Sequence, residues 1–247
     1  MSEQGFKRVS VSRLALVGVV MAVVTVASLA AFIAASAPAS SQLSAPMWLN
    51  APSATLTGRD IPVSGAIGVD ADLSGAVVKI YKREVGENAD TFVTDATVSY
   101  SQQTGNVFQA VVPTITRSCV ITATWEGDAA YLASSTWMFA GVKPKLTLTV
   151  KSATRNETKF RITVSPEQPF YRQPLTAPPF IADVQCRVHG AWTRFPGDLG
   201  VAGTDGKSWC TYSYYDLKPG KYLIRAHFGG TNYNVARVSV SQRIVVP

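Results

Sequence analysis

An alternating seven-residue segment occurs twice in this 247-residue chain, about 100 residues apart. The first copy is Cys119–Trp125 (CVITATW) and the second is Tyr222–Phe228 (YLIRAHF), and a glycine-containing turn and a tyrosine follow each copy. Alternate side chains of a β-strand point to opposite faces, so one face of each copy is apolar. A register shifted by one residue would bury Arg225 and His227 and is therefore excluded. The repeat predicts two similar β units.

Short alternating or β-branched segments recur beyond residue 48, separated by Gly, Pro, Asn and Asp, and no segment has the period of an amphipathic helix. We predict strands at Ala76–Lys82, Val107–Val112, Cys119–Trp125, Ser134–Val142, Leu146–Val150, Lys159–Val164, Val184–Val188, Trp209–Tyr215, Tyr222–Phe228 and Arg237–Val246. Frequent strands with turn residues between them are typical of an all-β sandwich. Because Pro144 stops a strand, we predict two domains, at residues 49–143 and 144–247.

One motif in the first repeat resembles a known family. The segment TATWEGDAAYLASST (122–136) resembles the strand, turn and tyrosine signature of prokaryotic Ig-like repeats, which occur in tandem on cell-surface proteins. The second copy, RAHFGGTNYNVA (225–236), is similar but one residue shorter and lacks the turn aspartate. The resemblance implies two tandem Ig-like β-sandwiches. It leaves the function open, since such domains serve as stalks, adhesins, envelope components and enzyme appendages.

Leu14–Ser36 is an apolar segment of 23 residues without a charge. A helix of this length spans the roughly 30 Å hydrocarbon core of a bilayer. Basic residues precede the segment and none follows until Arg59, so we expect residues 1–13 in the cytoplasm and the rest of the chain outside it. Small residues at 35–39 allow cleavage of a signal peptide as the alternative. Residues 37–48 are rich in Pro, Ser and Ala and predict a spacer.

Charge is divided unevenly along the chain, whose net charge is +7. Residues 46–142 carry five basic and nine acidic side chains, whereas residues 143–247 carry fifteen basic and six acidic ones. The charged fraction of 16% argues against a disordered polyelectrolyte. A basic module outside the cell suits an acidic protein, an acidic polysaccharide or the acidic domain of another copy. We expect no nucleic-acid partner, because no binding motif accompanies the basic charge.

Two of the three cysteines lie in the basic domain. Cys186 and Cys210 each fall on the apolar face of a predicted strand. In an Ig-like order these are middle strands of opposite sheets, so both thiols point into one core, and an oxidising compartment permits a bond. We predict a Cys186–Cys210 disulfide, with two separate buried thiols as the alternative. Cys119 is expected to be an unpaired, inward-pointing thiol.

No group of residues predicts catalysis. His189 and His227 lie on polar strand faces without a Cys or acid at metal-ligand spacing, and neither a nucleophile elbow nor a phosphate-binding glycine loop occurs. We therefore expect no enzymatic activity, no cofactor and no metal site. The sequon Asn156-Glu-Thr158 predicts a glycan if the host glycosylates outside the cell, and otherwise an exposed turn.

Aromatic residues concentrate in the basic domain, where exposed rings could stack on sugars or anchor a protein partner. Alternation assigns most of these rings to the core and leaves Trp192 and Tyr215 as candidates for exposure. Together with Arg187 and Arg194, they form the predicted binding surface.

These features favour a single-pass membrane protein that presents tandem Ig-like domains for protein–protein contact or adhesion at the cell envelope. A carbohydrate-binding module for acidic glycans is one alternative. An accessory subunit of a larger membrane enzyme or filament complex is another, docking through strand edges or the membrane helix. The expected partners include further copies of the chain in a homo-oligomer.

Overall fold

The computed structural model of the chain describes residues 42–169, 182–195, 198–215 and 217–247. The regular secondary structure in these ranges is β-strand, as the sequence predicts. Within the same ranges, no helix is long and apolar enough to cross a membrane. The segment 14–36, predicted to span the membrane, lies outside the described residues.

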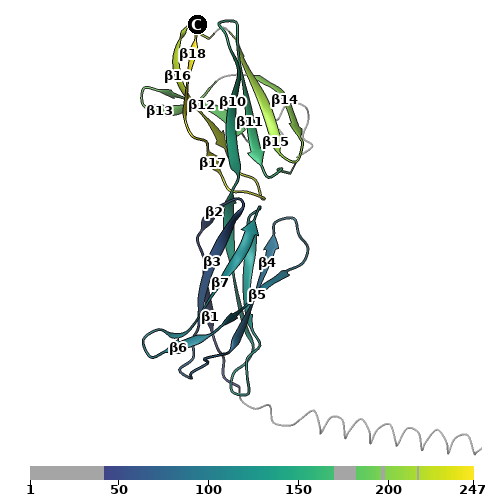
Figure 1. Cartoon of the computed structure of the whole chain (residues 1–247), viewed down its shortest axis with the longest axis vertical. Helices are drawn as coiled ribbons and strands as arrows, with labels where there is room; N and C mark the ends of the chain where they lie inside the picture. The colour runs from purple at the N-terminus through teal and green to yellow at the C-terminus, as the bar shows by residue number, and fades with distance from the viewer. Residues whose placement is uncertain (1–41, 170–181, 196–197, 216) are drawn as a thin grey trace, which may run out of the picture. The chain divides into compact units, whose positions relative to one another are not determined.

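The strands before Pro144 form two sheets, which we call the N-terminal sheet pair (Figure 1). Its strands are β1 (Met47–Asn50), β2 (Ala54–Leu56), β3 (Arg59–Ile67), β4 (Val77–Glu84), β5 (Thr91–Thr97), β6 (Ser99–Ser101), β7 (Gly105–Ile115), β8 (Cys119–Trp125) and β9 (Ser134–Lys143). One sheet has the order β1-β3-β7-β6 and the other β2-β9-β8-β4-β5. Neighbours are antiparallel except for β2, which pairs with β9 in parallel.

The strands after Pro144 form the C-terminal sheet pair (Figure 1). Its strands are β10 (Lys145–Ala153), β11 (Glu157–Ser165), β12 (Ala182–Val188), β13 (Ala191–Arg194), β14 (Asp198–Thr204), β15 (Ser208–Tyr215), β16 (Gly220–Phe228), β17 (Arg237–Val238) and β18 (Gln242–Val246). The sheet orders are β10-β11-β15-β14 and β13-β12-β16-β17, and β18 also pairs with β16. By their contacts, residues 44–128 and 132–247 form one compact unit.

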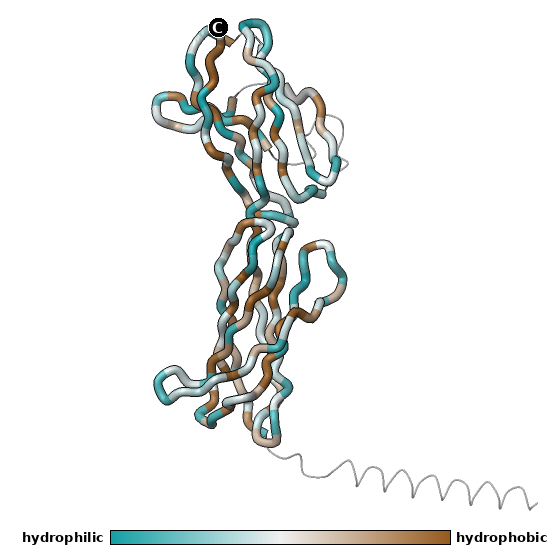
Figure 2. Tube along the Cα trace, in the orientation of Figure 1, coloured by the Kyte–Doolittle hydropathy of each residue, from teal (hydrophilic) through white to brown (hydrophobic). Residues whose placement is uncertain are grey.

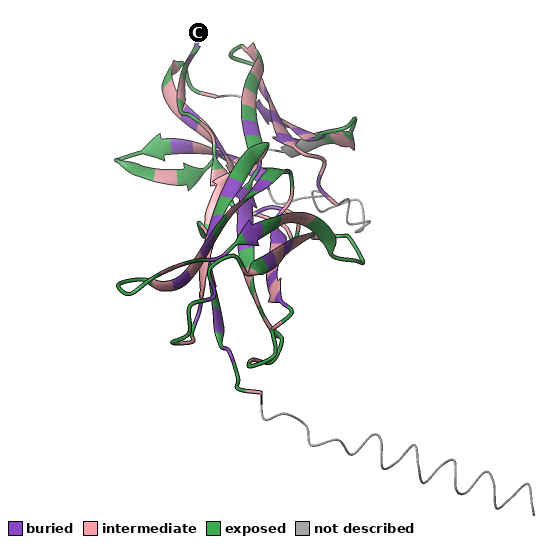
Figure 3. Cartoon of the chain, turned by 60° about the horizontal axis from the view of Figure 1, so that its bottom comes forward, coloured by how far each residue is buried: buried purple, intermediate pink, exposed green. Residues whose placement is uncertain are grey.

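The two copies of the repeat occupy corresponding places. Strand β8 lies between β9 and β4, and β16 lies between β17/β18 and β12. The register predicted from alternation is confirmed, since Arg225 and His227 are only half-buried while Ile224, Ala226 and Phe228 between and beside them are buried, and β8 alternates in the same way. Buried and less buried residues alternate along many of the strands (Figure 3). The turns that follow need glycine, because Gly127 and Gly230 have φ values of 77° and 92°.

Aromatic rings fill the core between the two sheets of the C-terminal pair. Phe160 on β11 contacts Tyr214 and Phe195 edge to face, with ring centroids 5.3 and 6.2 Å apart. Residues of both sheets belong to this one buried cluster, and apolar residues alternate with polar ones along the strands (Figure 2). Tyr212 and Tyr214 are buried, as their alternation predicts.

The predicted Cys186–Cys210 disulfide is not formed. All three cysteines are buried free thiols. Cys186 on β12 and Cys210 on β15 do lie in opposite sheets of one core, as expected. The prediction fails because the two residues lie at different heights along their strands.

Two contacts across the core establish these heights. The Tyr212 hydroxyl donates to the carbonyl of Ala182. The Tyr214 ring lies 4.4 Å from that of Phe195, whose N–H donates to the carbonyl of Val184. In both contacts, a residue of β15 lies level with the β12 residue whose number is lower by 30. The numbers of Cys210 and Cys186 differ by only 24, so the two cysteines are offset by about six residues, or roughly 20 Å, along the strands. A disulfide needs Cα atoms within about 7 Å.

The buried thiols predict a loss of stability at alkaline pH. Burial raises the pKa of Cys119 from 9.0 to about 11 and that of Cys210 to about 12. In the unfolded chain both thiols ionise near pH 9, so unfolding releases protons above that pH. Their stabilising contribution is therefore complete below pH 9 and decreases as the pH rises toward 12. Denaturant unfolding should give a lower free energy at pH 10.5 than at pH 8, with a smaller difference in Cys210→Ala.

The unsubstituted chain should carry no disulfide. Alkylation in denaturant without reductant should label three thiols by mass spectrometry, whereas the folded chain should react slowly because the thiolate is the reactive form. A single labelled thiol would contradict the register given above.

Candidate binding surface on the C-terminal sheet pair

The outer face of the sheet formed by β13, β12, β16 and β18 gathers basic side chains. Directly paired residues of neighbouring strands point to the same face. Arg194, Gln185 and Arg225 thus form one row across three strands, and Trp192 pairs with Arg187 beside it. On β18, an alternate outward residue is Arg243. We call this surface the arginine face; its members are Asp183, Gln185, Arg187, Trp192, Arg194, Lys221, Leu223, Arg225, His227 and Arg243.

Trp192 holds an arginine. The Cζ atom of Arg225 lies 4.1 Å from the centroid of the Trp192 ring, and Arg225 Nε donates to Gln185 Oε1 at 2.9 Å. Such stacking is attractive because the ring face carries negative charge density, and it leaves the guanidinium charge intact. Trp192 is half-buried. The Trp192 ring therefore orients the guanidinium group of Arg225 at the surface. The sequence instead predicts that the Trp192 ring is exposed and contacts the partner directly.

The acid on this face is already engaged. Asp183 Oδ1 lies 2.7 Å from His227 Nδ1, and the Asp183 side chain is only 16% exposed. None of the ion pairs among the described residues involves the arginines of this face, which are Arg187, Arg194, Arg225 and Arg243. The face therefore presents uncompensated positive charge.

The structure brings together three of the four residues predicted as a binding surface. Arg187, Arg194 and Trp192 share the arginine face, where Arg187 Nε also donates to the carbonyl of Gly190 at 3.3 Å. Sequence reasoning missed Arg225 and Arg243. Their outward positions follow from alternation, but their proximity to Arg187 depends on the order of strands in the sheet.

Tyr215 is not part of this surface. It is 60% exposed, but it lies on β15 in the other sheet, opposite Glu157. The outer face of that sheet has its own stack, in which Arg161 Cζ lies 4.1 Å from the Trp209 ring centroid. A hollow of about 250 Å³ on the same sheet is lined by Lys145, Thr147, Thr163, Ser165 and Lys207.

The predicted glycosylation site lies at the turn between β10 and β11. Asn156 is exposed, whereas Thr158 of the sequon is buried and its hydroxyl donates to the carbonyl of Thr154 at 3.3 Å. A glycan at Asn156 would have to be added before this hairpin folds. Glycosylation itself stays a prediction.

Among the described residues, no group of three or more His, Cys, Asp or Glu side chains is placed to hold a metal ion. The chain matches no known protein family and no curated protein. The chemistry of its surfaces therefore has to carry the functional proposal.

Proposed function

We propose that the chain is a membrane-anchored interaction protein of the cell envelope that binds an acidic partner through the arginine face. The observation that carries this proposal is the gathering of arginines from four strands on one outer sheet face. Guanidinium groups bind carboxylates through two parallel hydrogen bonds, and arginine and tryptophan are enriched at interface hot spots. A protein surface rich in Asp and Glu is the partner that best fits this chemistry.

We take the two sheet pairs to be tandem Ig-like β-sandwiches, at residues 49–143 and 144–247. Support comes from the strand orders, which correspond to the A-B-E-D and C′-C-F-G sheets of an Ig sandwich. The four-stranded sheets β1-β3-β7-β6 and β10-β11-β15-β14 occupy the first of these roles. Such a sandwich offers broad outer sheet faces on a rigid core, and such faces suit the binding of a macromolecular partner.

The proposed location rests on the sequence alone. The uncharged segment 14–36 is long enough to anchor the chain, and the basic residues before it favour a cytoplasmic N-terminus. In this orientation the arginine face is presented outside the cell. An acidic polysaccharide is the second candidate partner, because the same arginines would bind its carboxylates.

The test is binding of defined acidic polymers to the full-length chain in lipid nanodiscs. We expect poly-L-glutamate to bind and to be released by salt, since exposed charges are screened over about 8 Å at 0.15 M ionic strength. The triple variant Arg187→Gln, Arg194→Gln, Arg243→Gln should bind about tenfold more weakly, because three exposed ion pairs at about 0.5 kcal/mol each contribute about 1.5 kcal/mol. Titration calorimetry at several salt concentrations measures both effects.

The matched control removes the same charge from the other sheet of the same pair, with Lys145→Gln, Lys159→Gln and Lys207→Gln. This variant should keep the affinity of the original chain. Equal losses in both triple variants would mean that only net charge matters, and would overturn the proposed face. Binding of alginate without binding of poly-L-glutamate would transfer the proposal to acidic polysaccharides. Binding of neither polymer at low salt would refute it.

A further inference from the structure

A row of aromatic side chains crosses the outer face of the N-terminal sheet β2-β9-β8-β4-β5. Trp137 on β9 is directly opposite Thr122 on β8, which is opposite Tyr81 on β4. Tyr81 in turn is opposite Phe92 on β5. These four side chains point to one face, and we call them the aromatic row. The rings of Tyr81 and Phe92 meet edge to face, with centroids 5.8 Å apart.

The row is open to solvent. Trp137 is 69% exposed and Phe92 52% exposed. Phe139, two residues beyond Trp137 and opposite Val120, extends the apolar surface by another exposed ring. Soluble monomers rarely expose contiguous apolar patches of this kind, and aromatic residues are enriched at the centres of protein interfaces. The row therefore has the character of an uncovered interface.

The two basic side chains beside the row are paired within the chain. Arg83 Nε lies 3.5 Å from Asp90 Oδ1 on one side of the row, and Lys79 forms an ion pair with Glu126 on the other side. Asp95, which lies opposite Lys79, adds one acidic side chain, so the surroundings of the row carry little net charge. This composition does not suit the acidic partner of the arginine face and favours an apolar surface of similar kind.

We propose that a second copy of this chain covers the aromatic row in a symmetric dimer. Two sheet faces stacked about a twofold axis parallel to their strands place β9 of one copy over β5 of the other, and β8 over β4. Trp137 then faces Phe92 of the second copy, and Thr122 faces its Tyr81. Each of these two contacts forms twice, once in each direction.

The charged side chains favour a twofold axis parallel to the strands over a twofold axis across the strands. About the axis parallel to the strands, Lys79 faces Thr124 of the second copy and Arg83 faces its Val120. A twofold axis across the strands would instead place Lys79 against Arg83, a contact between like charges. The parallel axis also keeps the strands of both copies pointing the same way. That direction suits two copies anchored in one membrane, a point that rests on the proposed anchor.

Cysteine cross-linking of the full-length chain in nanodiscs tests the geometry. Facing sheets stack about 10 Å apart, too far for a direct disulfide but within the reach of a short bismaleimide. Thr122 lies beside the proposed axis, so Thr122→Cys treated with this reagent should form a cross-linked dimer on a denaturing gel. The native thiols are buried and should not react. Val111 provides the matched control, because it is 53% exposed and lies on β7 in the other sheet of the same pair. Val111→Cys should stay monomeric on the gel.

A second variant tests the energetics. Light scattering should show a dimer for the original chain and for Val111→Asp, and a monomer for Trp137→Asp. The dimer should persist at 1 M salt because its contacts are apolar. Dissociation by salt would indicate a head-to-tail contact between acidic and basic regions and would overturn the proposal. So would a monomeric original chain, or a dimer that survives Trp137→Asp without Thr122→Cys cross-linking. Neither result affects the polymer-binding test, which uses other residues.

Discussion

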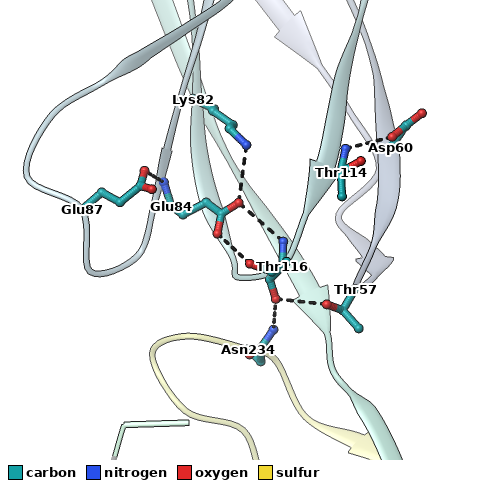
Figure 4. Close-up of polar contacts among 8 residues, drawn as sticks. All are labelled: Thr57, Asp60, Lys82, Glu84, Glu87, Thr114, Thr116 and Asn234. Carbon is teal, nitrogen blue, oxygen red and sulfur yellow. Dashed lines mark hydrogen bonds and ion pairs between the residues drawn. The ribbon is translucent and has the colours of Figure 1, made fainter. Parts of the chain in front are cut away.

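Replacing Asn234 by leucine is expected to lower the free energy of unfolding by about 3 kcal/mol. The side chain is fully buried in the loop between β16 and β17. Its Nδ2 donates to the carbonyls of Thr116 and Val142, at 3.0 Å each, and its Oδ1 accepts from Gln168 Nε2 at 2.8 Å (Figure 4 shows the Thr116 bond). Leucine removes three hydrogen bonds, and each contributes about 1 kcal/mol. The Thr116 and Val142 carbonyls and Gln168 Nε2 each keep a second partner, so the cost is that of the lost bonds.

These hydrogen bonds join the two sheet pairs, so we also expect the substitution to change the cooperativity of unfolding. Thr116 and Val142 belong to the N-terminal sheet pair, whereas Asn234 belongs to the C-terminal pair. The neighbouring Tyr233 adds to the junction, since its carbonyl accepts from the N–H of Ser118 at 2.6 Å. Loss of Asn234 should therefore uncouple the sheet pairs, so that one unfolding transition becomes two. Scanning calorimetry separates these outcomes.

The acceptor loop of the junction is itself held in place. The Thr116 hydroxyl donates to Glu84 Oε2 at 3.0 Å, and the Thr57 hydroxyl donates to the Thr116 carbonyl at 3.3 Å (Figure 4). Lys82 Nζ lies 3.5 Å from Glu84 Oε1.

The matched control for Asn234→Leu is Asn50→Leu, because Asn50 is exposed and a surface substitution changes the free energy of unfolding by less than about 0.5 kcal/mol. A loss below 1 kcal/mol for Asn234→Leu would show that water or other groups replace the lost bonds.

Phe160→Ala is expected to destabilise the chain by about 3–5 kcal/mol. Phe160 is fully buried in the C-terminal core and contacts the rings of Tyr214 and Phe195. Alanine removes the ring and leaves a cavity that the two remaining rings fill only in part. Denaturant unfolding followed by circular dichroism measures the loss.

The control for this core substitution is Tyr215→Ala. Tyr215 lies on β15, directly after Tyr214, but points to solvent. Its removal should change the free energy of unfolding by less than about 1 kcal/mol. Similar losses in the two variants would mean that the ring contacts of Phe160 contribute little beyond those of an exposed residue.

The strands of this chain could be predicted from sequence where alternation is regular. The prediction at Cys119–Trp125 matches β8 residue for residue, and those near β11, β12 and β16 differ only at their ends. The last predicted strand, Arg237–Val246, is divided into β17 and β18. The predicted segments do not include short strands such as β2 and β13, because three or four residues are too few to establish a period of two. They also omit the longer strands β3, β5 and β14. Strand β3 contains Pro62 and Gly65, residue types that are depleted in strands.

The aromatic row shows where alternation is ambiguous. In β9, Trp137 and Phe139 alternate with Met138 and Ala140, so both faces of the strand are apolar in sequence. Either set could face the core on composition alone. The structure buries Ala140 and exposes Trp137, because β9 pairs with β8 in the register that opposes Ala140 to Cys119.

Local sequence patterns are enough to predict that this chain is rich in β-strands, which side chains of each repeat strand point inward, and that its second half is strongly basic. These properties depend on residues close together in the chain. The folded structure is needed to know which arginines share a face, that Trp192 stacks on Arg225, and that Cys186 and Cys210 lie too far apart to bond. Strand order and the height of one sheet against the other arise from contacts between distant segments. A period of two residues sets the face of a side chain but not its neighbour on the next strand or across the core.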